Sequence, residues 1–334
     1  MVIGNPESFH VGAHFFKAAN EIGLKAVIKD IKGAFSESLL IQSALWKYGG
    51  HKPKNLGSFG NEVVAHCKEG CYSTVLATGI APLDRNCLRH LRSAGIQSIN
   101  YLTDDPWNRA HHAPWFLNAL SLYDNVFTTK SSIIQDLTNA GCRKIHFCPF
   151  GYDREVHNYP PHKDSAVEGL DILFVGGMDS DRKKIMEPLI GNNFCLALYG
   201  RYWDQSDRFA KSSCGHGDLF TLAKRGKEAK ITLCLVRRAN RDGHVMRSFE
   251  AAAAGGCMLV EDTEEHREIF GLDGDCVVFF NSNEQMVQRA RWLLDHPEER
   301  LRLRHAVYRR IVTEGKNTYT DRLKTILEKI GLSH

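Results

Sequence analysis

The stretch "RDGHVMRSFEAAAAGG" (241–256) lies between two short apolar runs, "KITLCLV" (230–236) and "CMLVED" (257–262). Apolar runs of this length are typical of buried strands, and the segment between them is long enough for a helix. The alanines let that helix pack closely on a sheet, and the two glycines end it. A strand–helix–strand unit of this kind predicts a parallel sheet whose faces are covered by helices.

The same alternation runs along most of the 334-residue chain. In the first half, apolar runs predict strands at 1–4, 25–30, 72–79, 97–104, 125–129 and 144–150. The periodicity between them predicts helices over 10–22, 83–94 and 131–140. In the second half, we expect strands at 170–177, 194–200, 231–236, 257–262 and 276–280. Helices are expected over 181–190, 218–228, 244–254 and 284–295, and again from Pro297 onward.

The segment 151–169 separates the two halves. It is polar, has no periodicity and contains two adjacent prolines, which favours a linker. The sequence therefore predicts an α/β fold with two doubly wound Rossmann-like domains. The first covers residues 1–158, a linker covers 159–169, and the second covers 170–334, whose terminal helices could pack back on the first domain. In such sheets ligands bind beyond the carboxyl ends of the strands, so the expected site is a cleft between the domains.

The composition excludes several classes of protein. Hydrophobic residues make up 43% and charged residues 25% of the chain, and no apolar run approaches the ~20 residues that span a bilayer. The formal net charge of +4 is too small to indicate a nucleic-acid partner. The first residues lack the pattern of a secretory signal, and the ten cysteines contain no CxxC pair, so we expect reduced thiols. These features predict a cytoplasmic protein.

The basic turn at the start of the quoted stretch predicts a phosphate site. A helix N-terminus presents unpaired N–H groups and a positive dipole end, which attract anions. Four arginines crowd the same place: Arg237, Arg238, Arg241 and Arg247. Asp242 and Glu250 are eight residues apart, and a carboxylate can accept two hydrogen bonds from the vicinal hydroxyls of a ribose. The alternative is a solvated ion pair between Arg247 and Glu250, worth a few tenths of a kcal/mol.

The segment "HVMRSFEAAAAGGCMLVEDTEEHREIF" (244–270) is similar to the characteristic motif of GT-B glycosyltransferases of family 4, most closely the spore-maturation (CgeB-like) subgroup. Members have an Arg three residues before a Glu, an Ala/Gly-rich helix, an apolar strand and an acidic turn. Further segments resemble the subgroup in the same order: 124–159, "DILFVGGMDSDRKKI" (171–185) and "NTYTDRLKTIL" (317–327). The resemblance covers roughly residues 124 to 330, and the first 120 residues match by pattern alone.

The resemblance implies the GT-B architecture, with a nucleotide-sugar donor such as a UDP-, GDP- or dTDP-sugar on the second domain and an acceptor on the first. The family has two glutamates eight residues apart. By this likeness Glu250 stands at the second of these positions and binds the ribose of the donor, and Asp242 stands at the first. Arg182 with Lys183 would neutralise the diphosphate. The other residues that the likeness or the basic turn places at the donor are Arg238, His244, Arg247 and Glu268.

A metal ion is not part of this prediction. Cations and helix N–H groups in a poorly hydrated cleft can stabilise the leaving diphosphate by themselves. The sequence "DSD" (179–181) has the form of a D-x-D motif, but "DGD" (273–275) has it as well, so the pattern is not specific. No cofactor is expected beyond the nucleotide-sugar substrate.

Polar residues after two strands of the first half are candidates for acceptor chemistry. His10 follows the first strand, and Asp104 and Asp105 follow the strand at 97–104. A carboxylate or imidazole at a strand end can take the proton of an acceptor hydroxyl. With Asp242, these three residues form the predicted catalytic set.

The sequence thus predicts a glycosyltransferase that moves a sugar from a nucleotide-sugar to a glycan, lipid-linked or other hydroxyl acceptor, with retention and without a metal. The expected partners are the donor and the acceptor, with no nucleic acid and at most peripheral membrane association. Two alternatives remain at this stage. One is a nucleotide-sugar epimerase on the same fold, and the other is a nucleotide-sugar-binding protein that has lost catalysis.

Overall fold

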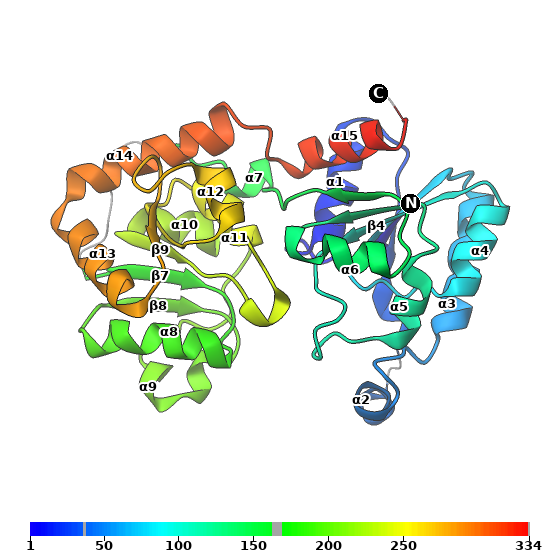
Figure 1. Ribbon diagram of the computed structural model, residues 1–334, viewed down its shortest axis with the longest axis horizontal. Helices are drawn as coiled ribbons and strands as arrows, with labels where there is room; N and C mark the ends of the chain where they lie inside the picture. The colour runs from blue at the N-terminus through cyan, green and yellow to red at the C-terminus, as the bar shows by residue number, and fades with distance from the viewer. Residues whose placement is uncertain (36–37, 162–168, 333–334) are drawn as a thin grey trace. The chain divides into compact units, whose positions relative to one another are not determined.

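The computed structural model describes residues 1–35, 38–161 and 169–332, and it consists of two compact units (Figure 1). Unit 1 contains Met1–Pro149, Ala239–Arg241 and the chain from Tyr319 onward, and unit 2 contains Phe150–Arg238 and Asp242–Thr318. The expected linker at 159–169 falls largely on 162–168, which lie outside the described residues. The structure assigns 150–161 to unit 2, where Tyr152 and Val156 are buried.

Unit 1 is built on a six-stranded parallel sheet in the order β2-β1-β3-β4-β5-β6. The strands are β1 (Val2–Gly4), β2 (Ile28–Asp30), β3 (Thr74–Thr78), β4 (Gln97–Leu102), β5 (Asn125–Thr128) and β6 (Ile145–Phe147). All neighbours are parallel, with pairs such as Leu76↔Ile99 and Tyr101↔Phe127. Each strand lies within a predicted segment, and the central strands β1, β3, β4 and β5 are mostly buried, whereas the edge strands β2 and β6 are only partly buried.

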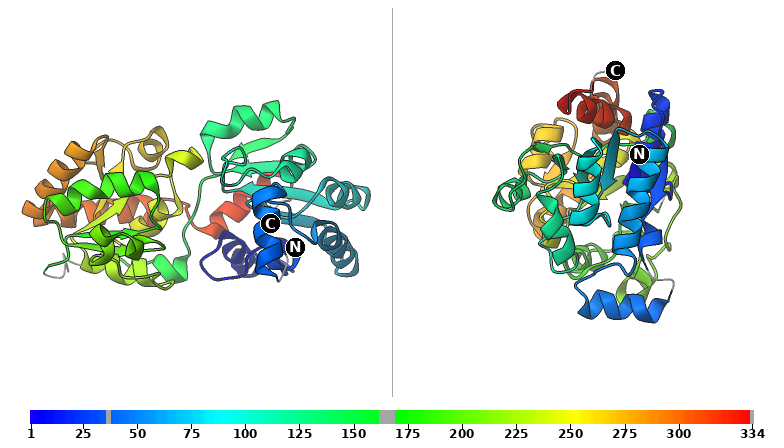
Figure 2. Two further views of the ribbon diagram at one scale, coloured as in Figure 1. Left: turned by 90° about the horizontal axis from the view of Figure 1, so that it is seen from below. Right: turned by 90° about the vertical axis from the view of Figure 1, so that its right-hand side faces the viewer.

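Helices cover both faces of this sheet: α1 (Val11–Glu21), α3 (Leu56–Glu69), α4 (Arg85–Ser93), α5 (Pro114–Leu120), α6 (Ile134–Asn139) and α15 (Tyr319–Lys329). Helix α2 (Leu39–Tyr48) belongs to the same unit and lies away from the sheet (Figure 1). One face carries a core shared by α3, α4 and α5 with strand residues such as Ile3, Val75 and Leu102. On the other face α1 packs beside α15, so the first and last elements of the chain lie in the same unit (Figure 2). The pattern analysis missed α2, α3 and α5, and the expected helix 131–140 divides into a 3₁₀ turn and α6.

Unit 2 is built on a five-stranded parallel sheet in the order β11-β10-β9-β7-β8. Its strands are β7 (Ile172–Val175), β8 (Leu196–Tyr199), β9 (Ile231–Cys234), β10 (Met258–Glu261) and β11 (Val278–Phe280). The helices are α7 (Arg154–His157), α8 (Ser180–Gly191), α9 (Asp207–Ala210), α10 (Thr221–Glu228), α11 (Met246–Ala253), α12 (Glu264–Phe270), α13 (Asn283–Asp295) and α14 (Pro297–Tyr308). Helices α8 and α13 pack on one face of the sheet, and α10 and α11 pack on the other.

The strand order places one topological switch point in each sheet. In unit 1 the chain moves from β1 outward to β2 and then crosses to β3, so the loops after β1 and β3 diverge. In unit 2 the same occurs at β7 and β9. Doubly wound sheets bind ligands where such loops separate, beyond the carboxyl ends of the strands. The prediction of two doubly wound α/β domains is confirmed. Within the described ranges, none of the helices is both long and apolar enough to cross a bilayer.

Candidate functional site

The loop after β7 is shaped by close backbone packing. Gly200 has a φ of +140°, and a Cβ on this residue would collide with the carbonyl group of Gly176. The indole N–H of the buried Trp203 also donates to the Gly176 carbonyl, at 2.7 Å. Only glycine fits where two backbones approach so closely and φ is positive. The first turn of α8 is therefore held close to the end of β7.

Arg182 is the cation at this position, and only 6% of its surface is exposed. Its Nη1 donates to the carbonyl oxygen of Gly177 at 3.1 Å, and its guanidinium lies over the ring of Phe174. Asp179 accepts hydrogen bonds from the backbone N–H groups of Asp181 and Arg182, so the first aspartate of "DSD" caps α8. Burial, with the nearby charge of Arg237, lowers the pKa of Arg182 to about 10. A buried cation with a lowered pKa gains from an anionic ligand.

Arg247 and Glu250 face the same strand end from α11. The Nε of Arg247 donates to the carbonyl oxygen of Val175, the last residue of β7, at 3.4 Å. Its Nη1 pairs with the carboxylate of Glu250, which is 2% exposed and also lies 3.9 Å from the Nε2 of His157. Because this carboxylate is buried, the alternative of a fully solvated ion pair is wrong. Three guanidinium groups, those of Arg182, Arg237 and Arg247, thus come from elements that meet at the switch point.

Asp242 lies half-exposed on the loop between β9 and α11. Its negative charge acts on Arg182 and opposes the lowering of that arginine's pKa, so the two side chains interact through space. Its backbone N–H donates to the carbonyl oxygen of Arg237 at 3.2 Å. The two acidic positions of the motif therefore differ: Asp242 is accessible, and Glu250 is enclosed.

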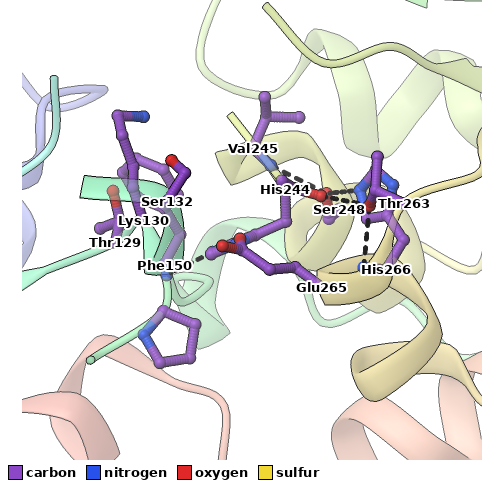
Figure 3. Close-up of polar contacts among 12 residues, drawn as sticks. Thr129, Lys130, Ser132, Phe150, His244, Val245, Ser248, Thr263, Glu265 and His266 are labelled. Atoms are coloured by element: carbon purple, nitrogen blue, oxygen red, sulfur yellow. Dashed lines mark hydrogen bonds and ion pairs between the residues drawn. The ribbon is translucent and has the colours of Figure 1, made fainter. Parts of the chain in front are cut away.

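A buried hydrogen-bond network holds the loop that leads into α11 (Figure 3). The backbone N–H of Phe150 donates to Nε2 of His244, whose Nδ1 faces Glu265 at 2.5 Å. These partners place the proton of His244 on Nδ1. Glu265 also leaves no room for a side chain at Gly243. The loop before α11 is consequently fixed to the first turn of α12.

A second pair in Figure 3 joins α11 to α12 directly. Ser248 accepts a hydrogen bond from the backbone N–H of Val245 and donates to Nε2 of His266 at 2.9 Å. The Nδ1 of His266 donates to the carbonyl oxygen of Glu261 at 2.7 Å. Burial lowers the pKa of His266 to about 4, so its ring is neutral at pH 7. Although this resembles a Ser–His dyad, Ser248 is completely buried, so the pair positions the helix rather than attacking a substrate.

One of the predicted donor contacts needs correction, and a second residue, whose side chain is 61% exposed, already has a protein partner. The side chain of His244 is 0% exposed and both ring nitrogens have protein partners, so this residue positions the loop and does not touch a ligand here. Arg238 pairs with the buried Glu261, which also accepts from the backbone N–H of Val236. Both outcomes have the same cause, which is a nearby buried carboxylate. Glu265, at the start of α12, binds the imidazole of His244, and Glu261, at the end of β10, binds the guanidinium of Arg238.

The two remaining donor candidates lie on helix surfaces. Lys183 is half-buried in the first turn of α8, next to Arg182. Glu268 is exposed on α12, whereas Glu265, one turn earlier on the same helix, lies inside the buried network. The sequence analysis missed Glu261 and Glu265. The position of Glu261 directly after the apolar residues of β10 could have identified it as a strand-end carboxylate.

In unit 1, Asp104 lies at the carboxyl end of β4. The hydroxyl of Thr103 donates to its carboxylate at 3.0 Å, and Nε2 of His111 lies 3.8 Å from its other oxygen. A Cβ on Gly79, the residue after β3, would lie 3.9 Å from the same carboxylate. The side chain of Asp104 is about one-third exposed, so this Asp–His pair is open to solvent.

Asp105 has a different environment and is corrected here. It is 3% exposed, and both carboxylate oxygens bind the guanidinium of Arg241, at 2.7 and 3.0 Å. Arg241 also binds Asp136 at 2.6 Å. Because the bidentate arginine occupies both carboxylate oxygens and the side chain is buried, Asp105 positions the loop after β4. His10 precedes α1, lies 3.5 Å from Glu7, and has its pKa lowered by burial.

Among residues 1–35, 38–161 and 169–332, no three His, Cys, Asp or Glu side chains are grouped as ligands for a metal ion. All ten cysteines are free, and seven are buried. Burial raises the pKa of several of these thiols, for example that of Cys142 to about 11. The buried thiols whose pKa is raised in this way are therefore protonated at neutral pH and unsuited to nucleophilic chemistry.

A family model described as "Glycosyl transferase-like" matches residues 182–328. This region begins at Arg182, contains α11 and ends in α15. No curated protein matches the chain by sequence.

Solved structures resemble the chain over nearly its whole length. Sucrose-phosphate synthase from Thermosynechococcus elongatus has a TM-score of 0.71 and 13% identity, with 99% of each chain covered. HepE from Anabaena, solved with UDP and glucose, has a TM-score of 0.66 and 12% identity over 98% of each chain. The UDP-forming α,α-trehalose-phosphate synthase from Burkholderia xenovorans has a TM-score of 0.64 and 12% identity, covering 99% of this chain and 98% of that one.

The likeness to these structures confirms the predicted GT-B fold. The family match concerns the glycosyl-transfer reaction, because the matched residues 182–328 include Arg182, Arg247 and Glu250. The chain therefore has the GT-B fold, and its residues 182–328 match a family model described as "Glycosyl transferase-like", in agreement with the predicted enzyme class, a glycosyltransferase.

Proposed function

We propose that the chain transfers a sugar from a UDP-sugar to a hydroxyl group of a glycan, lipid-linked or other acceptor, with retention and without a metal ion. The observation that carries this proposal is the set of three guanidinium groups at the β7–β9 switch point, beside the buried carboxylate of Glu250. UDP is favoured as the leaving group because HepE, of the same fold, was solved with UDP. The likeness of 244–270 to the spore-maturation (CgeB-like) subgroup is part of this proposal.

In the proposed complex the diphosphate lies at the first turn of α11, next to Arg182 and Arg247. The N–H groups of that turn and the arginines stabilise the charge that develops as the bond between the sugar's anomeric carbon and the diphosphate breaks. The electron pair of this bond remains on the diphosphate oxygen. Because Arg182 is already desolvated and fixed by Gly177, it needs little reorganisation during the step.

Glu250 is proposed to bind the ribose. Arg247 covers its carboxylate but is itself partly exposed, so the guanidinium can turn toward the diphosphate and leave an oxygen for the ribose hydroxyls. Lys183 adds positive charge at the same helix end, and Asp242 is placed to contact the sugar ring. Glu268 remains a proposed donor contact, and its side chain is exposed on α12.

On the acceptor side, Asp104 is the proposed base. Its carboxylate takes the proton of the acceptor hydroxyl while the hydroxyl oxygen bonds to the anomeric carbon on the face that the diphosphate leaves. Thr103 orients the carboxylate by its hydrogen bond, and the imidazole of His111 lies 3.8 Å from the other carboxylate oxygen. His10 remains a candidate for contact with the acceptor.

The first test compares UDP and uridine by calorimetry for the wild type, Arg182→Ala and Arg182→Lys. A charge-assisted hydrogen bond is worth about 1.5–3 kcal/mol, so Arg182→Ala should weaken UDP binding about tenfold to hundredfold and uridine binding much less. Arg182→Lys keeps the charge but loses the planar fork, and should fall between the two. Circular dichroism checks that each variant is folded.

The matched control is Arg208→Ala, which removes an exposed arginine of α9. It should bind UDP as the wild type does. Equal losses for UDP and uridine in Arg182→Ala would contradict a phosphate contact. A panel of UDP, GDP, dTDP and CMP in a thermal-shift assay then checks the base, and stabilisation by none of the four would overturn the proposed function.

A further inference from the structure

Unit 1 contains a cavity of about 370 Å³ on the side of its sheet that α1 and α15 cover. Its walls include Leu323, Ile326 and Leu327, which share one face of α15, and Phe15 and Ala19 of α1. Its floor is formed by side chains from three neighbouring strands: Val2, Leu76 and Ile99. The cavity is therefore part of unit 1 alone.

The cavity lies at the opposite end of the sheet from the groups assigned to transfer. Ser73 and Thr74, which also line it, are at the amino end of β3, whereas Gly79 and Asp104 follow the carboxyl ends of β3 and β4. A ligand in this cavity would thus occupy a site separate from the acceptor side. The inference below does not rest on the proposed function.

The size and lining of the cavity favour an apolar ligand. Protein interiors are close-packed, and voids larger than a water molecule are few. A volume of about 370 Å³ falls within the range of small-molecule sites, which are mostly apolar with a few polar groups. Water would gain few hydrogen bonds against leucine, isoleucine and phenylalanine side chains, so an apolar chain fills such a space better.

The rim of the cavity is positively charged. Lys25 lines it and is exposed; its Nζ donates to the Gly70 carbonyl at 3.0 Å and lies over the Tyr72 ring. No Asp or Glu belongs to the lining, all of which falls within the described residues. An ammonium at the opening of an apolar cavity with no nearby lining carboxylate fits a ligand that is apolar along its length and anionic at one end.

We infer that this cavity binds the alkyl chain of a fatty-acid-like amphiphile, with its carboxylate beside Lys25. The chain extends between α1 and α15 over Leu76 and Ile99. Such a ligand would bind unit 1 and stabilise it by mass action, whether or not a nucleotide is bound to unit 2.

The experiment measures decanoate binding to the full chain by calorimetry and thermal shift, with butyrate as the short-chain comparison. Decanoate should bind saturably and raise the melting temperature, and butyrate should do neither. Ala19→Phe fills the cavity from α1 and should weaken decanoate binding by at least about tenfold. This is the loss of affinity expected when a few methylene groups of the ligand can no longer be buried. Ala94→Phe, at an exposed alanine after α4, is the matched control and should bind as the wild type does.

Leu323→Phe fills the same space from α15 and replaces Ala19→Phe if that variant does not fold. In either folded variant, the melting temperature without ligand should stay the same or rise, since the added ring takes up empty apolar space. If decanoate binds the filled and wild-type proteins equally well, the ligand lies elsewhere and the inference is wrong.

The charge at the rim is tested with Lys25→Glu and with decanol, which has the same chain and no carboxylate. The wild type should prefer decanoate, and Lys25→Glu should reverse that preference. Saturable binding of decanol and decanoate with equal affinity would contradict the inference that the ligand has an anionic end. Failure of both to bind would overturn the site itself, and neither result bears on UDP binding by unit 2.

Discussion

The carboxyl edges of the two sheets differ in how they hold charge. In unit 2, Arg182, Glu250, Glu261 and Glu265 are all buried, and each is fixed by a partner within the same unit. In unit 1, Asp104 and His111 are partly exposed and lie 3.8 Å apart. The charged side chains at the carboxyl edge of the unit 2 sheet are thus buried and already paired, which we call the buried set. Asp104 and His111 of unit 1 are partly exposed, and we call them the open set.

This difference has a physical meaning. Charges that are fixed before the ligand arrives act strongly because little reorganisation is needed and water is excluded. That arrangement suits a ligand that is always the same, such as a nucleoside diphosphate. A partly hydrated pair interacts more weakly, but it tolerates ligands of different shape. The comparison predicts large effects for changes in the buried set and smaller ones for changes in the open set.

The largest effect is expected for Glu250→Gln. The substitution keeps the shape of the side chain and removes its charge, so the ribose loses an ionic acceptor and Arg247 loses its partner. We expect kcat/KM for the donor to fall by about 10²- to 10³-fold, or roughly 3–4 kcal/mol. Steady-state kinetics with a UDP-sugar measures it.

The control for this variant is Glu264→Gln, an exposed carboxylate in the first turn of α12. It should leave kcat/KM unchanged. A Glu250→Gln enzyme with wild-type turnover and donor affinity would remove the distinction between the buried and open sets.

The second effect concerns pH and the buried His266. Its pKa is about 4 in the folded state because of burial, against 6.5 in the unfolded chain. Between these values the unfolded state binds a proton that the folded state does not, so stability falls as the pH falls from 6.5 to 4. The loss from this group amounts to roughly 3 kcal/mol at pH 4. Urea unfolding at several pH values measures it.

His266→Gln should flatten this dependence, because the amide can still donate to the Glu261 carbonyl and accept from Ser248 but does not titrate. His216→Gln changes an exposed histidine and should keep the wild-type slope. If the slope of His266→Gln matches that of the wild type, His266 is not the group that titrates.

The smallest effect is expected in the open set, for Asp104→Asn. Loss of a partly hydrated base should slow transfer by about thirtyfold, below the usual range for proton transfer because solvent can take part of the role. UDP affinity should not change. A coupled assay for UDP release and calorimetry separate the two quantities. Glu69→Gln, on an exposed acid at the end of α3, is the control, and a change in UDP affinity in Asp104→Asn would show that the two sets are not independent.

Much of the fold was predictable because the central strands of parallel sheets are buried on both faces and therefore rich in apolar residues. The eleven strands of the described residues all lie within predicted segments, including short ones such as β6 and β11. Helices whose pattern gives no clear face were missed. The clearest case is α2, whose Leu40 and Tyr48 are exposed although they are apolar or aromatic, so no periodicity marks a buried side.

The candidate site was predictable in outline only. The spacing of Arg247 and Glu250 follows from helix geometry and places both near one strand end, and Asp242 lies on the loop before that helix. Competition between partners could not be foreseen: Arg238 binds Glu261, His244 binds Glu265, and Asp105 binds Arg241. The two residues of each pair are 21 to 136 residues apart in sequence, and no local pattern relates them.

The sequence by itself determined the α/β class, the positions of the strands and the cationic turn before the alanine-rich helix, because these depend on local periodicity and composition. The tertiary structure alone decided which charges are buried, which are already paired, and that α1 and α15 enclose an apolar cavity. Those outcomes depend on which residues meet across long sequence separations, and strand order and helix packing set those meetings.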